Sequence, residues 1–103
     1  MQERQPMSEA MYYILLALLH PVHGYGVMQR VRELSGDRLV LGPGTLYGIL
    51  TRMHAEGYIR LESAEGRRKV YAITEAGTKA LQEEYRRLKT LVQDGKILEE
   101  ESE

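Results

Sequence analysis

The rest of the chain is organised around the stretch Gly42-Pro43-Gly44-Thr45-Leu46-Tyr47-Gly48-Ile49-Leu50-Thr51-Arg52-Met53-His54-Ala55-Glu56-Gly57. Its Gly-Pro-Gly opening is typical of a turn, so the sequence predicts a helix that begins near Thr45. Gly57 is typical of the left-handed residue that ends a helix. Between these two signals the apolar residues recur at steps of three and four, which predicts one buried face made of Leu46, Ile49, Leu50 and Met53.

The opposite face of this predicted helix is short of acidic groups and rich in small and hydroxyl side chains. A helix that enters a DNA groove needs such a face, because it must approach closely and must not repel the phosphates. The candidate contacts are Thr45, Tyr47, Gly48, Thr51 and Arg52, with His54 as a further contributor. Plainer alternatives exist: Tyr47 packed in the core, Gly48 packed closely against the preceding helix, and Arg52 paired with Glu56 one turn on.

Two helices are predicted before this stretch. The first runs over about 8–19 and is apolar almost all round, which is typical of a helix buried on more than one side, often by a partner subunit. His20-Pro21 ends it. The second begins at residue 24 or 25 and ends at Leu34. Its start either offers Tyr25 and free backbone amides to a phosphate, or packs Tyr25 against the next helix.

After Gly57 the apolar spacing changes to a period of 2, which predicts a strand over 58–62, a turn over 63–66 and a returning strand over 67–73. The returning strand begins with three cations, Arg67, Arg68 and Lys69. A charge run at a hairpin tip is usually only solvated. Its position after the candidate recognition helix favours contact with phosphates or the minor groove.

A long last helix is predicted over about 75–94, with Thr74 as its cap and Gly95 as its stop. Twenty residues span about 30 Å, which is longer than the core of a small domain covers. A heptad-like apolar stripe on this helix predicts a partner helix. The expected dimer contacts on the first and last helices are Met11, Leu15, Leu81, Tyr85, Leu88 and Val92. Residues 96–103 are acidic, which predicts a disordered, solvated tail.

Composition argues against several classes of protein. The 103 residues suffice for one small domain, and there is no cysteine for a disulfide, a thiolate nucleophile or a cysteine zinc site. The longest apolar run, eight residues at 12–19, is too short to cross a membrane. His20 and His23 lack neighbouring metal ligands, and no serine or histidine has a recognisable catalytic neighbourhood. We therefore expect a cytoplasmic protein with no metal, no cofactor and no enzymatic activity.

The net charge of −1 conceals a gradient along the chain. Residues 42–72 hold five basic and three acidic side chains, whereas residues 73–103 hold five basic and eight acidic ones. Affinity for nucleic acid depends on a local basic surface, so a nearly neutral total does not exclude it. The order of helix, helix, helix, hairpin and long helix predicts a mainly α (α+β) fold. Its parts are a winged helix-turn-helix domain over 8–73 and a dimerisation helix over 74–95.

Three segments, in this order and spacing, carry a resemblance to a known family: His23-Gly24-Tyr25-Gly26, Gly44-Thr45-Leu46-Tyr47 and Gly66-Arg67-Arg68-Lys69-Val70-Tyr71-Ala72-Ile73-Thr74-Glu75-Ala76-Gly77. With them, residues 8–92 resemble the PadR family of transcriptional regulators, in its short subgroup without an extended C-terminal domain. The resemblance implies a bacterial or archaeal DNA-binding repressor that dimerises through its first and last helices. Some short members sense aromatic drugs in a central pocket built around a tryptophan. This chain has no tryptophan, and its candidates for such a pocket are Tyr12, Tyr13 and Tyr85.

The sequence therefore predicts a homodimeric repressor that places two recognition helices in successive major grooves of an inverted repeat. Thr45, Thr51 and Arg52 are expected to read bases, and the wing is expected to supply salt-sensitive affinity. A small aromatic inducer is a possible further partner. The alternative is a winged-helix protein-interaction module without sequence-specific DNA binding, whose basic hairpin docks on an acidic partner.

Overall fold

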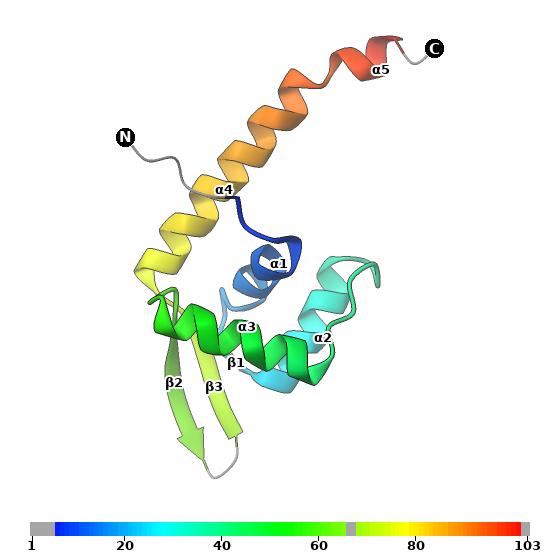
Figure 1. The fold of residues 1–103 in the computed structure, drawn as a ribbon. Helices are drawn as coiled ribbons and strands as arrows, with labels where there is room; N and C mark the ends of the chain where they lie inside the picture. The colour runs from blue at the N-terminus through cyan, green and yellow to red at the C-terminus, as the bar shows by residue number, and fades with distance from the viewer. Residues whose placement is uncertain (1–5, 66–67, 102–103) are drawn as a thin grey trace.

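The computed structural model describes residues 6–65 and 68–101, and it contains the predicted helices and hairpin together with two short additional elements. Figure 1 shows α1, α2 and α3 gathered beside the β2–β3 hairpin, while α4 leads away from it. This is the predicted winged helix-turn-helix with a long C-terminal helix. The elements in chain order are α1 (Glu9–Ala17), β1 (Val22–His23), α2 (Gly24–Leu34), α3 (Pro43–Ala55), β2 (Ile59–Glu65), β3 (Arg68–Ile73), α4 (Glu75–Asp94) and α5 (Ile97–Glu101).

Helix α3 begins two residues earlier than the sequence predicted. Gly42 is its N-cap, with extended backbone angles of φ −79° and ψ 162°, and Pro43 is its first helical residue. Proline is favoured at this position because the first helical N–H has no acceptor within the helix and the ring presets φ. The Gly-Pro-Gly opening is thus the cap and first turn of the helix. Gly57 has a φ of +84°, which confirms the predicted left-handed residue after the helix.

Helix α1 is shorter than predicted. Its N-terminus is capped as expected, because the Oγ of Ser8 accepts a hydrogen bond of 3.1 Å from the N–H of Met11. It ends at Ala17 instead of Leu19. The chain then turns toward the sheet, where the carbonyl of Leu18 accepts a hydrogen bond of 3.1 Å from the N–H of Ile73. The end of α1 is therefore tied to the last strand.

The sheet is antiparallel in the order β1-β3-β2. The two-residue strand β1 was not predicted, because two residues are too few to show an alternating pattern. It pairs Val22 with Tyr71 and His23 with Val70. This pairing brings the start of α2 against the returning strand of the wing.

The wing is longer than predicted on its first arm. The expected turn over 63–66 was placed too early, because β2 continues through Glu65. The pairing shifts register after Leu61, which faces Tyr71, so that Ser63 faces Val70. An irregularity of this kind lets a strand bend and still keep its ladder. Residues 66–67, including the candidate Arg67, lie outside the described residues.

One apolar cluster joins the helices to the sheet. Burying such a side chain contributes about 1.5–3 kcal/mol relative to leaving it exposed. Both Leu15 and Leu81, which were expected at a dimer interface, belong to this cluster, with exposures of 0% and 5%. The buried members are Ile14, Leu15, Ala17, Leu18, Val27, Val31, Leu41, Leu46, Leu50, Met53, Ile59 and Leu81.

The end of α3 and the start of α4 meet at one joint. The Oγ1 of Thr74 accepts a hydrogen bond of 3.0 Å from the N–H of Gly77, which confirms it as the cap of α4. The same hydroxyl donates to the carbonyl of Gly57 at 2.7 Å. The N–H of Thr74 donates to the carbonyl of Tyr58 at 3.0 Å. A Cβ at Gly77 would overlap that carbonyl of Tyr58, so only glycine permits this approach.

The second half of α4 extends beyond the core. Leu91 and Val92 are 53% and 66% exposed, and the molecule measures 56 × 36 × 21 Å along its principal axes. Residues 96–103 were expected to form a disordered tail, but Ile97–Glu101 form the short, exposed helix α5. In the described parts of the chain, no helix combines the length and apolar character that a membrane crossing requires.

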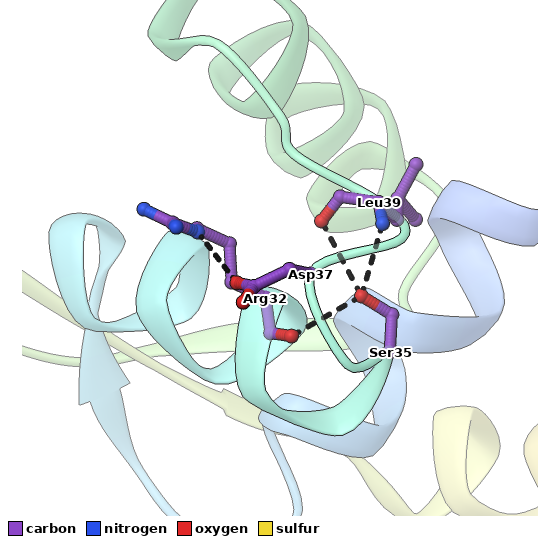
Figure 2. A network of polar contacts seen from close by, with 4 residues as sticks. All are labelled: Arg32, Ser35, Asp37 and Leu39. Carbon is purple, nitrogen blue, oxygen red and sulfur yellow. Dashed lines mark hydrogen bonds and ion pairs between the residues drawn. The ribbon is translucent and has the colours of Figure 1, made fainter.

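A polar network fixes the loop between α2 and α3 (Figure 2). The Oγ of Ser35 accepts from the N–H of Leu39 at 3.0 Å, and the Nε of Arg32 donates to the Oδ1 of Asp37 at 3.2 Å. Asp37 has a φ of +63°, a conformation that aspartate tolerates better than most residues.

The next residue of this loop connects it to α1. The guanidinium of Arg38 pairs with Glu9 at 2.6 Å and donates to the hydroxyl of Tyr13 at 3.0 Å. The loop that sets the position of α3 is thus attached to α1.

Candidate nucleic-acid interface

One face of α3 is buried and the other is open. Leu46, Leu50 and Met53 are buried, and Ile49 is half-buried, which confirms the predicted packing stripe. The exposed face carries all five residues predicted on it: Thr45, Tyr47, Gly48, Thr51 and Arg52.

Gly48 has no packing reason to be glycine. Within the described residues, no neighbouring element lies within 4 Å of the place that a Cβ would occupy. Close packing against α2, which was the alternative explanation, is therefore wrong. Glycine costs about 1 kcal/mol relative to alanine inside a helix, and at residue 48 it leaves the backbone of α3 open on the exposed side.

Two polar side chains of this face are already engaged. The Oγ1 of Thr51 donates to the carbonyl of Tyr47 at 2.8 Å. The Nε of Arg52 lies 3.4 Å from the Oε1 of Glu56, with both side chains well exposed. An exposed pair of this kind contributes only about 0–1 kcal/mol. It is therefore easily exchanged for a phosphate or a base edge.

Tyr47 joins α3 to the start of α2. A Cβ at Gly24 would overlap the ring and hydroxyl of Tyr47, so the absence of a side chain at residue 24 makes room for this tyrosine. Tyr47 nevertheless remains 45% exposed. Tyr47 is therefore not a core residue, so that alternative is wrong, although its ring rests on the start of α2.

A cavity of about 260 Å³ opens beside Tyr47, and we call it the cationic cavity. Its described lining holds two cations, two phenol hydroxyls, one imidazole and the first turn of α2, and none of these groups is acidic. Backbone N–H groups of a first helical turn have no acceptor within the helix and favour an anion. The cavity therefore suits a phosphate. It is lined by His23, Gly24, Tyr25, Tyr47, Arg68 and Lys69.

Tyr25 does not pack against α3 as one alternative held. It is 63% exposed and lines the cationic cavity. Four predicted contacts from three elements, Tyr25, Tyr47, Arg68 and Lys69, are thus brought to one place. His23 joins them, although the sequence had offered it only as an improbable metal ligand. Among the described residues, no group of three metal-ligating side chains is gathered anywhere.

A second hollow of about 150 Å³ lies between α3 and the wing, lined by Leu50, Thr51, His54, Leu61, Lys69 and Tyr71. Lys69 lines both hollows. Burial raises the pKa of Tyr71, and the neighbouring Tyr47 raises it further. Tyr71 therefore keeps its proton as a donor. Sequence reasoning missed this residue because it was counted only as a strand position.

The expected dimer contacts divide into two groups. Leu15 and Leu81 belong to the core of the single chain, with exposures of 0% and 5%, so their assignment to a dimer surface is wrong; Leu81 reaches only the hollow between α1 and α4. Tyr85 and Val92 are 56% and 66% exposed, whereas Met11 and Leu88 are half-buried. The physical reason is that only the first half of α4 packs on α1. The apolar stripe of α4 is therefore buried near the start of the helix and exposed toward its end.

The first half of α4 and α1 enclose an apolar hollow of about 300 Å³. Tyr12 and Tyr85 line it as expected, but Tyr13 does not. The ring of Tyr13 instead meets that of Tyr12 edge-on, with centroids 6.1 Å apart. The hydroxyl of Tyr13 accepts a hydrogen bond from Arg38. Burial raises the pKa of Tyr12, and Tyr85 adds to this rise. The lining residues are Tyr12, Leu16, Leu19, Thr78, Leu81, Gln82, Tyr85 and Arg86.

Comparison with known proteins places this geometry in a family. Residues 14–83 match the family described as the transcriptional regulator PadR-like family. A protein named as a transcriptional regulator of Mycobacterium tuberculosis is 36% identical over 97 residues, which cover 91% of this chain and 88% of that protein. By contrast, the chain spans only 22% of an uncharacterized 37.1 kDa protein of a Streptomyces fradiae transposon, to which it is 37% identical over 78 residues.

Solved structures agree with this placement. A PadR family transcriptional regulator from Eggerthella lenta superposes with a TM-score of 0.72 and 27% identity, covering 86% of this chain and 80% of that one. PadR of Bacillus subtilis, in complex with operator DNA, superposes with a TM-score of 0.64 and 25% identity, covering 78% of this chain and 48% of that one. Sequence match and fold thus agree, and the chain belongs to the PadR-like family of transcriptional regulators.

Proposed function

We propose that this protein is a homodimeric repressor that binds double-stranded DNA through α3, the wing and the start of α2. The observation that carries the proposal is the cationic cavity, where Tyr25, Tyr47, Arg68 and Lys69 converge without an acidic neighbour among the described lining residues. Family membership supports it, and so does the B. subtilis PadR complex with operator DNA. The site of action is the cytoplasm, where bacterial and archaeal DNA lies.

Each element has a distinct task in this proposal. The exposed face of α3 enters the major groove, where Thr45 and Arg52 reach base edges and Gly48 lets the helix backbone approach. The cationic cavity holds one backbone phosphate, and Arg68 and Lys69 supply affinity that depends on salt instead of sequence. The Thr51 hydroxyl has to give up its bond to Tyr47 before it reads a base.

Dimerisation is proposed through the open half of α4. Tyr85, Leu91 and Val92 are each more than half exposed on this helix. An apolar helix surface of this kind calls for a second helix, and a second copy of the chain supplies one with two-fold symmetry. Two recognition helices related in this way match an inverted repeat.

An inducer is proposed to enter the apolar hollow between α1 and α4. Tyr12 and Tyr85 offer ring faces there, and Arg86 offers a charge at the rim. A flat aromatic compound suits such a lining, because ring pairs gain about 0.5–1.5 kcal/mol beyond the area that they bury. Ligand binding close to the open half of α4 would alter the pairing of the two copies and release the DNA.

A titration with fluorescent DNA tests the proposal. The protein is added to a duplex from the region upstream of its own gene and to a random duplex, at several salt concentrations. We expect tighter binding to the first, and the double variant Arg68→Ala/Lys69→Ala should weaken binding to both and reduce the salt slope by about 2. The matched control is Lys79→Ala/Lys96→Ala, which removes two exposed cations away from the cavity and should bind normally.

Two results would contradict the proposal. Comparable weak binding of the protein to both duplexes would favour the alternative, a protein-interaction module whose basic hairpin meets an acidic partner. An unchanged affinity in Arg68→Ala/Lys69→Ala would remove the wing from the interface even if DNA binding itself were confirmed.

A further inference from the structure

His23 lies where the sheet, α2 and the cationic cavity meet. Its backbone pairs with Val70 in the sheet, it is the N-cap residue of α2, and it lines the cavity. As an N-cap its side chain makes no capping hydrogen bond. Over residues 6–65 and 68–101, its half-buried imidazole has no hydrogen bond or ion pair. The ring is therefore free to bind a group that comes from outside the protein.

Among the described residues, the side chains that line the cavity together with this imidazole are neutral or cationic. Tyr25 comes from α2, Tyr47 from α3, and Arg68 and Lys69 from β3. The first-turn amides of α2 add partial positive charge. A phosphate placed in the cavity would favour the protonated imidazole, because an anion within about 4–6 Å favours the charged form of a base.

The two forms of an imidazole differ in what they offer to a phosphate. The neutral ring has one N–H donor, whereas the protonated ring has two donors and a charge. Charge-assisted hydrogen bonds are roughly twice as strong as neutral ones. Protonation would therefore strengthen a contact between His23 and a phosphate oxygen.

We propose that His23 is a proton-linked contact to a DNA backbone phosphate, so that each protomer takes up one proton at this residue when it binds. The inference rests on the proposed DNA-binding function and adds to it a regulation by pH. Because the complex binds more protons than the free protein, affinity rises as pH falls. The gain is lost as pH rises past the titration of the DNA-bound imidazole. One linked proton changes affinity by at most about tenfold per pH unit.

The test compares DNA affinity between about pH 8 and pH 6, where histidines ordinarily titrate, at constant ionic strength. We expect the affinity of the wild type to rise about tenfold for each bound protomer across this range, hence about a hundredfold for a dimer that binds through both protomers. His23→Gln keeps an N–H donor but cannot titrate, so it should bind DNA with little dependence on pH. His20→Gln is the matched control, because His20 is exposed and lines the hollow between α1 and α2 instead. His54→Gln tests the third histidine, which lies on α3.

The outcomes separate this inference from the function on which it rests. Binding by the wild type without a pH slope, or an unchanged slope in His23→Gln, overturns the role of His23 and leaves DNA binding standing. A wild type that binds no DNA at any pH overturns both proposals. Loss of the slope in His54→Gln but not in His23→Gln would assign the proton to α3 and also overturn the inference.

A second measurement does not depend on how well the variant folds. The chain has three histidines, so their ring C–H signals in a proton NMR spectrum are few. We expect the signal of His23 to titrate at higher pH when DNA is present than when it is absent, and the signal of His20 to be indifferent to DNA. Equal midpoints for His23 in the two conditions would refute the proton linkage.

Discussion

The ring of Tyr47 occupies the space that a side chain at residue 24 would fill, and this contact joins α3 to the start of α2. Gly24→Ala should therefore displace Tyr47. We expect a loss of at most about 1 kcal/mol in the free energy of unfolding, at the low end of overpacking costs, because the overlapped atoms are the far end of an exposed side chain that can turn aside. DNA binding should weaken. Urea denaturation and a DNA titration measure the two effects.

Tyr47→Ala provides the companion for a double-mutant cycle. If the overlap is the cause, Gly24→Ala should cost little stability once residue 47 is alanine. Costs that simply add in Gly24→Ala/Tyr47→Ala would show that the two residues do not interact.

Gly48→Ala should raise stability and lower function. The new methyl group meets open space, and alanine is favoured over glycine in a helix by about 1 kcal/mol. Thermal unfolding should therefore move to a higher temperature. DNA affinity should fall, because the methyl group keeps the backbone of α3 away from the groove. Gly95→Ala, at the far end of α4, is the control and should leave DNA affinity unchanged. A Gly48→Ala variant that binds normally would argue against close approach at this position.

Leu81 and Val92 should respond in opposite ways. Leu81→Ala opens the core of the single chain, so we expect a loss of about 2–5 kcal/mol in the free energy of unfolding. Val92→Asp changes an exposed residue, so the fold should persist while the protein becomes monomeric in light scattering. Thr90→Asp introduces the same charge at an exposed position on the other side of α4 and is the control. A wild type that is already monomeric would contradict the proposed dimer.

Alkaline pH should weaken the fold through Tyr12. Burial and the neighbouring Tyr85 raise its pKa above the ordinary value of 10.0. Below pH 10 the phenol is neutral in both the folded and unfolded states, so stability is fully present. As pH rises further, the unfolded chain loses this proton first, so stability declines until the pKa of the folded state is passed. Urea denaturation on either side of pH 10 should show this decline, and Tyr12→Phe should show a smaller one. An equal decline in Tyr12→Phe would assign the effect to other groups.

Local signals in the sequence were sufficient for most element boundaries. As helix caps or stops, Ser8, Thr74 and Gly57 act through their own atoms or through residues within one turn, so these roles can be predicted from a short stretch. The same holds for the packing stripe of α3. The strand β1 could not be predicted, because it exists only through pairing with Tyr71 and Val70, which lie about fifty residues away.

The candidate site was predictable in part for a related reason. Charge and helix position identified Tyr47, Arg68 and Lys69, and the structure gathers them in one cavity. His23 was missed because only the pairing of β1 brings it there. The stripe on α4 misled the assignment of Leu81, since spacing shows that residues share a face but not which neighbour covers each part of it. The buried Glu84 was missed for the same reason, and its partners include Arg87 and the N–H of Met7.

The joint at Thr74 has a mechanical consequence. Its hydroxyl donates to the carbonyl of Gly57, which follows α3, and its N–H donates to the carbonyl of Tyr58, so a rotation of α4 is coupled to the C-terminal end of α3. In the proposed dimer, the angle between the two α4 helices would then set the distance between the two α3 helices. Because α4 has twenty residues, a small rotation at the joint would move its far end by a larger distance. Operator spacing would thus be encoded far from any base contact.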